Sequence, residues 1–232
     1  MGDILSIASA MLTNSQLRVE SSGRNIVHYN DPAYRRSISF SSHLEQPVAE
    51  GGTIENSAHE FSSGKYLISD NPLDLAIEGE GFFVVSDGAT SLYTRSGSFR
   101  LREGRLVDPR GYVLQAAEGG DLMIGDGTPS FAFDGLALRD GVPAGRVAIV
   151  DFADRSTLRS DDGVLFSGPA EAAVQVERPA LRQGMTEGSN VAMADEMVRM
   201  MAALRGAETG QRLVQAYDDL LGRALTAFGG NG

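Results

Sequence analysis

The 232-residue sequence contains no cysteine. Disulfide bonds, cysteine-ligated zinc, iron–sulfur clusters and thiol catalysis are therefore excluded, while the cellular compartment stays open. Positive charge is also scarce, because the net charge is −11 and the sequence pI is about 4.7. A protein that binds nucleic acid usually carries a basic patch for the phosphates, and the only adjacent arginines are Arg35 and Arg36. We therefore expect no nucleic-acid partner.

Long apolar runs are missing as well. No stretch approaches the ~20 apolar residues that a membrane-spanning helix needs. The first residues, Met1 to Leu5, lack the basic and apolar regions of a cleaved secretory signal. We therefore expect no membrane insertion and no cleaved signal peptide. The composition is otherwise globular, with 42% apolar and 22% charged residues, and 28 glycines favour tight turns and a β-rich middle.

Apolar and small residues recur in steps of three and four between Asp3 and Ile26. This spacing predicts an N-terminal α-helix with a heptad seam, meaning a line of contact residues along one face. The seam consists of Leu5, Ala8, Leu12, Ser15, Val19, Ser22 and Ile26.

The same spacing returns between Ser189 and Phe228 and predicts a second, longer helix. Ser189 or Asn190 is expected to cap its start, and Asp195 and Glu196 suit the positive end of the helix dipole. The glycine pair after Phe228 is expected to end it. Its seam consists of Met193, Met197, Met200, Leu204, Ala207, Gln211, Val214, Asp218, Leu221, Leu225 and Phe228.

The segment between the helices, about Pro32 to Gly184, has the pattern of short strands separated by turn residues. It begins with an extended stretch, Tyr34–Phe40, and continues with a polar loop, Ser41–Ser69. We expect an antiparallel sheet or an open barrel. The expected strands are residues 75–77, 81–85, 91–95, 98–101, 105–107, 111–114, 131–138, 146–152 and 174–177.

Residues 73–114 are expected to form a folding unit with one buried face on each strand. The alternation of period two selects the inward residues, and Gly79 and Gly81 flank a bend where a side chain would strain the turn or block a neighbouring strand. The predicted core residues are Leu75, Ile77, Phe82, Val84, Tyr93, Phe99, Leu106 and Val113.

The fold class that follows is a mainly β body, residues 32–184, between an N-terminal helix, residues 1–31, and a C-terminal helical segment, residues 185–232. The two helices are expected to pair as a coiled coil. One interpretation is an ordinary antiparallel helix pair packed on the sheet. The other is that the helices also contact neighbouring subunits, because seams on terminal helices suit self-assembling tubes.

Motifs that carry chemistry are weak in this sequence. His28, His43 and His59 do not have the spacing of metal ligands, and Gly79-x-Gly81 lacks the third glycine of a dinucleotide loop. Residues 161–163, Asp-Asp-Gly, predict a turn rather than a calcium site. We expect no catalytic residue, cofactor or metal, hence no enzyme. The alternative is a β-rich binding or hydrolase domain, since a catalytic triad is recognised by geometry rather than by sequence.

Four segments carry a family resemblance that covers nearly the whole chain. They are residues 23–36, 71–114, 147–166 and 183–208, and the central one, which begins Asn-Pro-Leu-Asp-Leu-Ala-Ile-Glu-Gly-Glu-Gly-Phe-Phe-Val-Val, is the most specific. Together they resemble the flagellar rod and hook family. In the first segment the residues that stand where the family has them are Asn25, Asn30, Pro32, Tyr34 and Arg35. Ala33 replaces a glycine and His28 an asparagine, so we expect the local turn to differ.

The resemblance implies a structural axial subunit of the bacterial flagellar basal-body rod, which spans the periplasm. Such a subunit self-assembles through its terminal helices and transmits torque from motor to hook. Its implied partners are other rod and hook subunits and the flagellar type III export apparatus, which exports it without a cleaved signal peptide. The short link from Arg36 to Leu73 favours a proximal rod subunit, with a distal rod or hook-type subunit as the alternative. The residues expected to carry assembly are Leu5, Leu12, Val19, Ile26, Asn25, Asn30, Pro32, Tyr34, Ser189, Asn190, Met197, Leu204, Val214 and Leu221.

Overall fold

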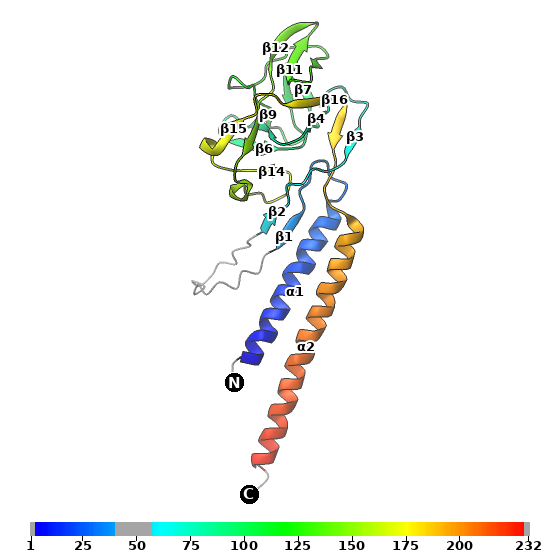
Figure 1. The fold of residues 1–232 in the computed structure, drawn as a ribbon, viewed down its shortest axis with the longest axis vertical. Coiled ribbons are helices and arrows are strands. Elements are labelled where there is room, and N and C mark those ends of the chain that lie inside the picture. The colour runs from blue at the N-terminus through cyan, green and yellow to red at the C-terminus, as the bar shows by residue number, and fades with distance from the viewer. Residues whose placement is uncertain (1–2, 40–56, 230–232) are drawn as a thin grey trace. The chain divides into compact units, whose positions relative to one another are not determined.

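The computed structural model describes residues 3–39 and 57–229, and these residues form two compact units. The helical unit contains α1 (Asp3–Val27), β1 (Ser37–Ser39) and α2 (Met193–Gly229). The β unit comprises His28–Arg36 and His59–Val191 and holds most of the strands. Within the helical unit, α1 and α2 lie side by side (Figure 1).

The helix bounds agree with the sequence except at the start of α2. Helix α1 ends one residue beyond Ile26, and α2 ends at Gly229. Helix α2 begins only at Met193, however, so the cap predicted at Ser189 or Asn190 is wrong. The Ser189 hydroxyl accepts the Val191 N–H, and the Asn190 amide bonds to backbone of the β unit. Neither side chain is therefore available to the first turn of α2.

The strands are antiparallel and divide among five sheets in the described residues, so the open barrel considered above does not form. The largest sheet has the order β14-β6-β5-β9-β8-β7, with β13 pairing both β5 and β15. The others are β10-β11-β12, β1-β2, β16-β4 and β17-β3. The strand bounds are β2 Ser57–His59, β3 Tyr66–Ile68, β4 Leu75–Glu78, β5 Phe82–Ser86, β6 Ser91–Thr94, β7 Arg100–Arg102, β8 Arg105–Val107, β9 Val113–Leu114, β10 Ser130–Phe131, β11 Leu136–Arg139, β12 Val142–Arg146, β13 Ile149–Phe152, β14 Leu165–Phe166, β15 Ala173–Gln175, β16 Ala180–Gln183 and β17 Met185–Glu187.

Two differences from the predicted strands have local causes. The expected strand 131–138 is a hairpin of β10 and β11, and the expected strand 146–152 divides into β12 and β13. Strands β2 and β3 lie within the predicted polar loop, whose residues 41–56 are outside the described part of the chain. These strands pair with β1 and β17, which are distant in the sequence. Their positions could therefore not be predicted from local periodicity.

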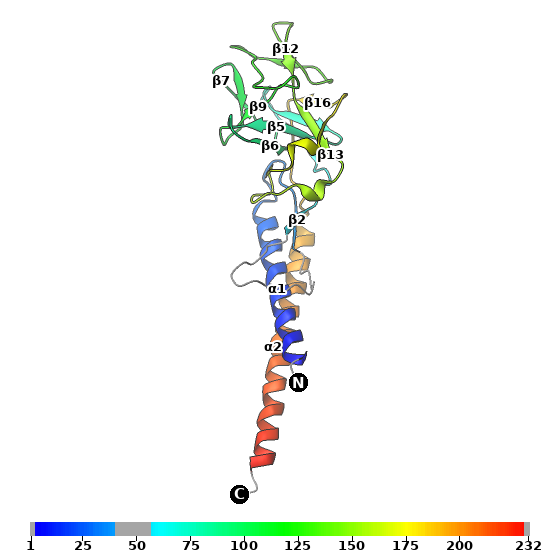
Figure 2. The ribbon, with the colours of Figure 1, turned by 90° about the vertical axis from the view of Figure 1, so that its left-hand side faces the viewer.

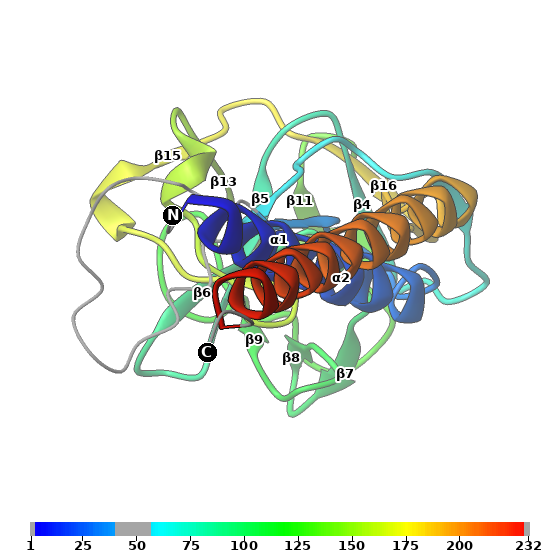
Figure 3. The same ribbon diagram turned by 90° about the horizontal axis from the view of Figure 1, so that it is seen from below.

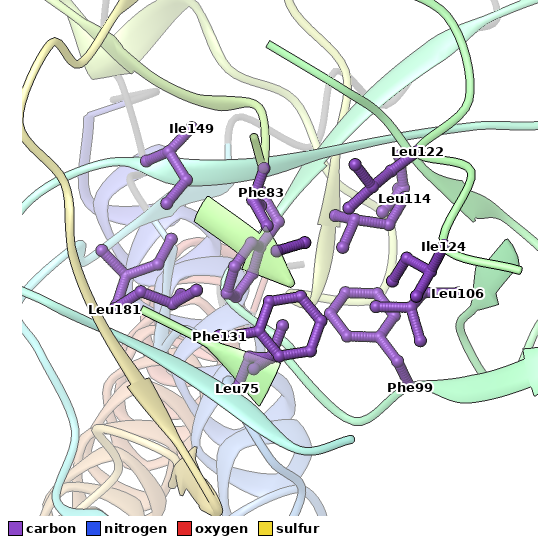
Figure 4. Packing of buried hydrophobic residues seen from close by; sticks show 14 residues of the cluster. Leu75, Phe83, Phe99, Leu106, Leu114, Leu122, Ile124, Phe131, Ile149 and Leu181 are labelled. Carbon is purple, nitrogen blue, oxygen red and sulfur yellow. The ribbon is translucent and has the colours of Figure 1, made fainter. Parts of the chain in front are cut away.

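Two hydrophobic clusters form the core of the β unit, and β5 contributes to both. Phe83 and Val85 belong to the larger cluster (Figure 4), while Phe82 belongs to the second cluster and Val84 packs against it. The larger cluster consists of Leu75, Ile77, Phe83, Val85, Phe99, Leu106, Leu114, Leu122, Ile124, Phe131, Ala137, Val147, Ile149 and Leu181. The expectation of one buried face on β5 is therefore wrong, because both of its faces are covered.

Six of the eight predicted core residues are buried, whereas Val84 and Val113 are only partly buried. Leu75, Ile77, Phe82, Tyr93, Phe99 and Leu106 are each at most 3% exposed. Val113 is only partly buried, and Leu114 beside it is fully buried instead. Gly81 confirms the expected crowding: its φ is +117°, and an added Cβ would lie 2.9 Å from Cγ2 of Ile149.

The turn at Ala33 keeps a glycine-like conformation without a glycine. Ala33 has φ of 61° and is fully buried, and its N–H donates to the carbonyl oxygen of Glu187 at 2.8 Å. The expectation that alanine would change this conformation is therefore not met. A left-handed backbone at a non-glycine residue costs roughly 1–2 kcal/mol, so the surrounding contacts hold the residue in a strained state.

Replacing Ala33 with glycine should therefore stabilise the protein. We expect a net gain of about 0.5–1 kcal/mol, because the relief of strain exceeds the entropy cost of glycine. Urea unfolding of the full chain measures it. Ala76→Gly is the control: Ala76 is fully buried in β4, where glycine should destabilise by about 1 kcal/mol. An Ala33→Gly protein that unfolds at a lower urea concentration than the parent would contradict the strain argument.

Candidate functional site

Helices α1 and α2 contact each other through small residues. A Cβ added at Gly206 would lie 2.8 Å from Oγ of Ser15, and one added at Gly210 would lie 3.1 Å from Cγ of Leu12. Gly23 faces Cε of Met200 at the other end of the contact. The order of these contacts shows that the helices run antiparallel, as Figure 2 and the view from below in Figure 3 also show. The close approach requires glycine or another small residue on at least one helix.

The buried face of α1 is the predicted one, but that of α2 is turned by one position. Ala8, Ser15 and Ser22, which recur every seven residues, are buried on α1. Among the described side chains of α2, the buried positions are Glu196, Ala203 and Gly210, rather than the adjacent Met197, Leu204 and Gln211. The small residues take the contact because they let the two backbones approach, and the larger apolar side chains are displaced to the side.

An apolar face consequently remains exposed on the helical unit. Met197, Met201 and Leu204 share one side of α2, at spacings of four and three residues, and are 48%, 53% and 49% exposed. Helix α2 continues past the first turn of α1 (Figures 1 and 2). Leu220 and Leu221, near the C-terminal end of α2, are also exposed. We call the side formed by Met197, Met201 and Leu204 the exposed apolar face, whereas the other exposed apolar residues of the two helices lie elsewhere on them: Leu5, Ile7, Met11, Val198, Leu220 and Leu221.

The predicted assembly residues therefore fall into three groups. Leu5, Met197, Leu204 and Leu221 are exposed on the helices, with Met197 and Leu204 on the exposed apolar face, and Leu12, Val19, Ile26 and Val214 are partly buried on the helices. The remaining residues either form hydrogen bonds with the backbone or lie on the surface. They are Asn25, Asn30, Pro32, Tyr34, Ser189 and Asn190.

Asn25 fixes the strand that follows α1. Its amide donates to the carbonyl oxygen of Ser37 at 2.9 Å and accepts the Ser37 N–H at 2.8 Å. The hydroxyl of Ser21, one turn earlier on α1, donates to the same carbonyl at 2.8 Å. Asn25 is fully buried. An asparagine is needed here because its side chain offers both a donor and an acceptor.

Asn190 plays a comparable part within the β unit. Its Oδ1 accepts the N–H of Arg36 at 2.7 Å, and its Nδ2 donates to the carbonyl oxygen of Glu60 at 2.7 Å. Its own N–H donates to the carbonyl oxygen of Tyr34 at 3.3 Å. The structure thus brings together two predicted residues, Tyr34 and Asn190, although Asn30 and Pro32 lie exposed on the same loop.

A buried ionic triad lies close to these residues, and the sequence analysis missed it. Glu187 accepts from Nη2 of Arg35 at 2.8 Å and from Nε of Arg95 at 2.7 Å, and these three side chains are at most 3% exposed. The N–H of Gly64 donates to the same carboxylate at 2.9 Å. Arg95 also donates to the carbonyl oxygens of Gly81 and Ile77. No local pattern reveals such a triad, because its members are far apart in the chain.

The histidines and acidic residues do not build a metal centre in the described residues. His28 contacts Asp31 at 2.7 Å, the ring nitrogens of His59 face backbone carbonyl oxygens, and His43 lies outside the described residues. Asp162 accepts backbone N–H groups in the turn that its sequence predicted. No described helix is long and apolar enough to cross a membrane.

One surface pocket of about 370 Å³ is lined by several titratable groups. A β-rich hydrolase, the alternative considered above, would require such a pocket. Arg110, Arg159, Asp161 and Asp162 line it. Burial raises the pKa of Asp162, but the N–H groups of Leu165 and Val164, together with Arg110, bring it below the ordinary value. Asp162 is therefore held as an ion-paired carboxylate, which makes it a poor proton carrier near neutral pH.

Comparisons with known proteins agree with the resemblance found in the sequence. Residues 76–137 match the family described as "Flagellar hook protein FlgE/F/G D1 domain". Residues 182–227 match the family described as "Flagellar basal body rod FlgEFG protein C-terminal". The first match covers β4 to β11 and the second covers nearly all of α2.

Individual relatives extend the match to most of the chain. The flagellar basal-body rod protein FlgF of Salmonella typhimurium is 32% identical, over 74% of this chain and 74% of its own length. The flagellar basal-body rod protein FlgG of Borreliella burgdorferi is 30% identical, over 78% and 74%. FlgG of Bacillus subtilis is 29% identical, over 90% and 93%. The chain therefore belongs to the family of flagellar basal-body rod proteins.

Proposed function

We propose that this rod protein assembles with neighbouring axial subunits through the exposed apolar face of its helical unit. The observation that carries the proposal is the position of that face: α1 and α2 use small residues for their mutual contact and leave methionines and leucines in solvent. Contiguous exposed apolar patches of this kind mark protein–protein interfaces. Methionine side chains adapt to contacts that are nearly but not fully equivalent, as between rod subunits in different positions.

In the assembled rod, the terminal helices would pair as a coiled coil in the axial core. Residues 1–31 and 185–232 would form that core, with residues 32–184 as a separate β body. Burial of apolar surface contributes about 25 cal/mol per Å², so repeated burial around a common axis stabilises a tube. A rod built in this way can transmit torque from motor to hook.

Export and location follow from the family. We infer that the flagellar type III export apparatus delivers the subunit to a rod that spans the periplasm, where other rod and hook subunits are its partners. Relatives named FlgF and FlgG match at similar identity. The short link between Arg36 and Leu73 supports a proximal, FlgF-type position, and a reconstruction of isolated basal bodies that locates this chain tests it against the distal one.

Leu204→Asp tests the role of the exposed apolar face. We expect the free protein to keep its circular dichroism spectrum and melting temperature, because Leu204 is about half exposed. Assembly should fail, because an unpaired charge buried in an interface costs several kcal/mol. Motility and rod content of isolated basal bodies are measured in a strain whose own copy carries the change.

Ala202→Asp is the matched control. It introduces the same charge into α2, two residues away and therefore on nearly the opposite side of the helix, at a position that is also exposed. We expect it to assemble. A motile strain carrying Leu204→Asp together with Leu221→Asp would refute the proposal.

A further inference from the structure

A second pocket, also of about 370 Å³, lies in the β unit above the buried ionic triad. Three arginines, Arg35, Arg95 and Arg155, contribute to its lining, together with Glu80 and Ser63. The pocket is separate from the exposed apolar face, since all of its lining residues belong to the β unit. The proposed assembly role therefore does not account for it.

The charges of the buried triad do not balance, although Arg155 in the same lining has two carboxylates to itself. Arg155 is matched by Asp151 at 2.9 Å and by Glu80 at 3.1 Å. Arg35 and Arg95 share a single carboxylate, that of Glu187. Two cations with one anion leave one positive charge without a partner in a buried place, where an unmatched charge is costly.

Arg35 shows where this charge is least compensated. Nη2 bonds to Glu187, whereas Nε and Nη1 are buried and have no hydrogen-bond partner among residues 3–39 and 57–229. Nε carries one N–H and Nη1 carries two, so three of the five N–H groups have no acceptor. Burial lowers the pKa of Arg35, opposed by the Glu187 carboxylate. Buried polar groups without partners are rare and call for an acceptor.

We propose that this pocket binds a carboxylate, which accepts from Arg35 and neutralises the unmatched charge of the triad. A carboxylate fits better than a divalent phosphate for two reasons. One negative charge is enough to balance the triad, and Glu80 in the lining repels a divalent anion more strongly than a monovalent one. Guanidinium and carboxylate groups also form the stronger, charge-assisted class of hydrogen bond.

The direct test is an acetate titration of the full-length protein at constant ionic strength, with chloride as the replaced anion. The ¹⁵N NMR signal of Arg35 Nε–H should shift progressively with acetate. Sulfate should act more weakly, and an equal response to sulfate would overturn the preference for a carboxylate. The Arg35 signal could instead shift with protein concentration when chloride is the only anion. In that case the carboxylate comes from an acidic side chain of a second copy of the protein.

A tethered carboxylate locates the site without altering any arginine. Ser63 lines the pocket and is exposed, so substitution there should leave the fold intact. Ser63→Glu should have a melting temperature about 2–4 °C above that of Ser63→Gln, because its carboxylate reaches the triad. The Arg35 signal should no longer respond to acetate in Ser63→Glu, and should still respond in Ser63→Gln.

Two outcomes would overturn the proposal. One is an Arg35 signal that responds neither to acetate nor to protein concentration, because water alone would then satisfy its N–H groups. The other is an acetate response of equal size in Ser63→Glu and Ser63→Gln, because the anion would then bind elsewhere.

Discussion

Replacing Glu187 with alanine should destabilise the β unit by about 3–5 kcal/mol or prevent it from folding. The carboxylate holds two buried guanidinium groups, and its removal leaves both without an anion. The N–H of Gly64 loses its acceptor as well. Since typical domains are stable by only about 5–15 kcal/mol, this one change removes a large part of the total.

Urea unfolding measures this loss, with tyrosine fluorescence as the probe. The chain has no tryptophan, and five of its six tyrosines lie in the β unit, so the signal reports mainly on that unit. Glu78→Ala is the control, because Glu78 forms an ion pair with Arg182 at the surface. Exposed pairs contribute about 0–1 kcal/mol. Equal losses in the two variants would show that the triad does not stabilise the fold.

Phe82→Ala should cost about 3–5 kcal/mol, the usual range for removing a fully buried aromatic ring. Phe82 is 2% exposed and lies among the rings of Phe61, Phe152 and Phe166 at centroid distances of 5.7 to 6.2 Å. These edge-on and tilted contacts contribute beyond the buried area. Phe82→Leu keeps most of the volume and should cost less than half as much.

Phe83→Ala distinguishes the observed packing from the one-sided packing predicted by alternation. Phe83 lies on the other face of β5, is fully buried and meets Phe99 edge-on at 5.6 Å. It should therefore destabilise as strongly as Phe82→Ala, in the same urea experiment. A Phe83→Ala protein as stable as the parent would mean that only one face of β5 is covered.

The sequence predicted the elements that depend on local pattern. Helix α1, the end of α2 and strand β8 agree to within a residue, because periodicity and glycine positions define them. The same reasoning ranked contact residues by hydrophobicity and so chose Leu204 over Ala203 on α2. The side of a helix that is buried depends on how closely the partner helix approaches, and small residues on that side allow the close approach.

Contacts between distant segments were beyond local reasoning. Arg35 and Glu187 are separated by 152 positions, and the pairing of β3 with β17 also joins remote segments. Arg35 and Glu187 themselves lie in segments that resemble the rod and hook family. The resemblance thus identified the family correctly, while the residues that hold its β unit together became visible only in three dimensions.

The unequal lengths of the two helices give the helical unit two different ends. Helix α2 has 37 residues and α1 has 25, so about 18 Å of α2, at ~1.5 Å per residue, has no α1 alongside it. Leu220 and Leu221 are exposed near that C-terminal end of α2. If two copies paired symmetrically through this overhang, the opposite ends of their helical units would make no contact. Head-to-tail contacts, in contrast, generate a filament with a direction when their rotation does not close a ring. In the assembly proposed above, the overhang would therefore give the rod a polarity, with a different helix surface at each of its ends.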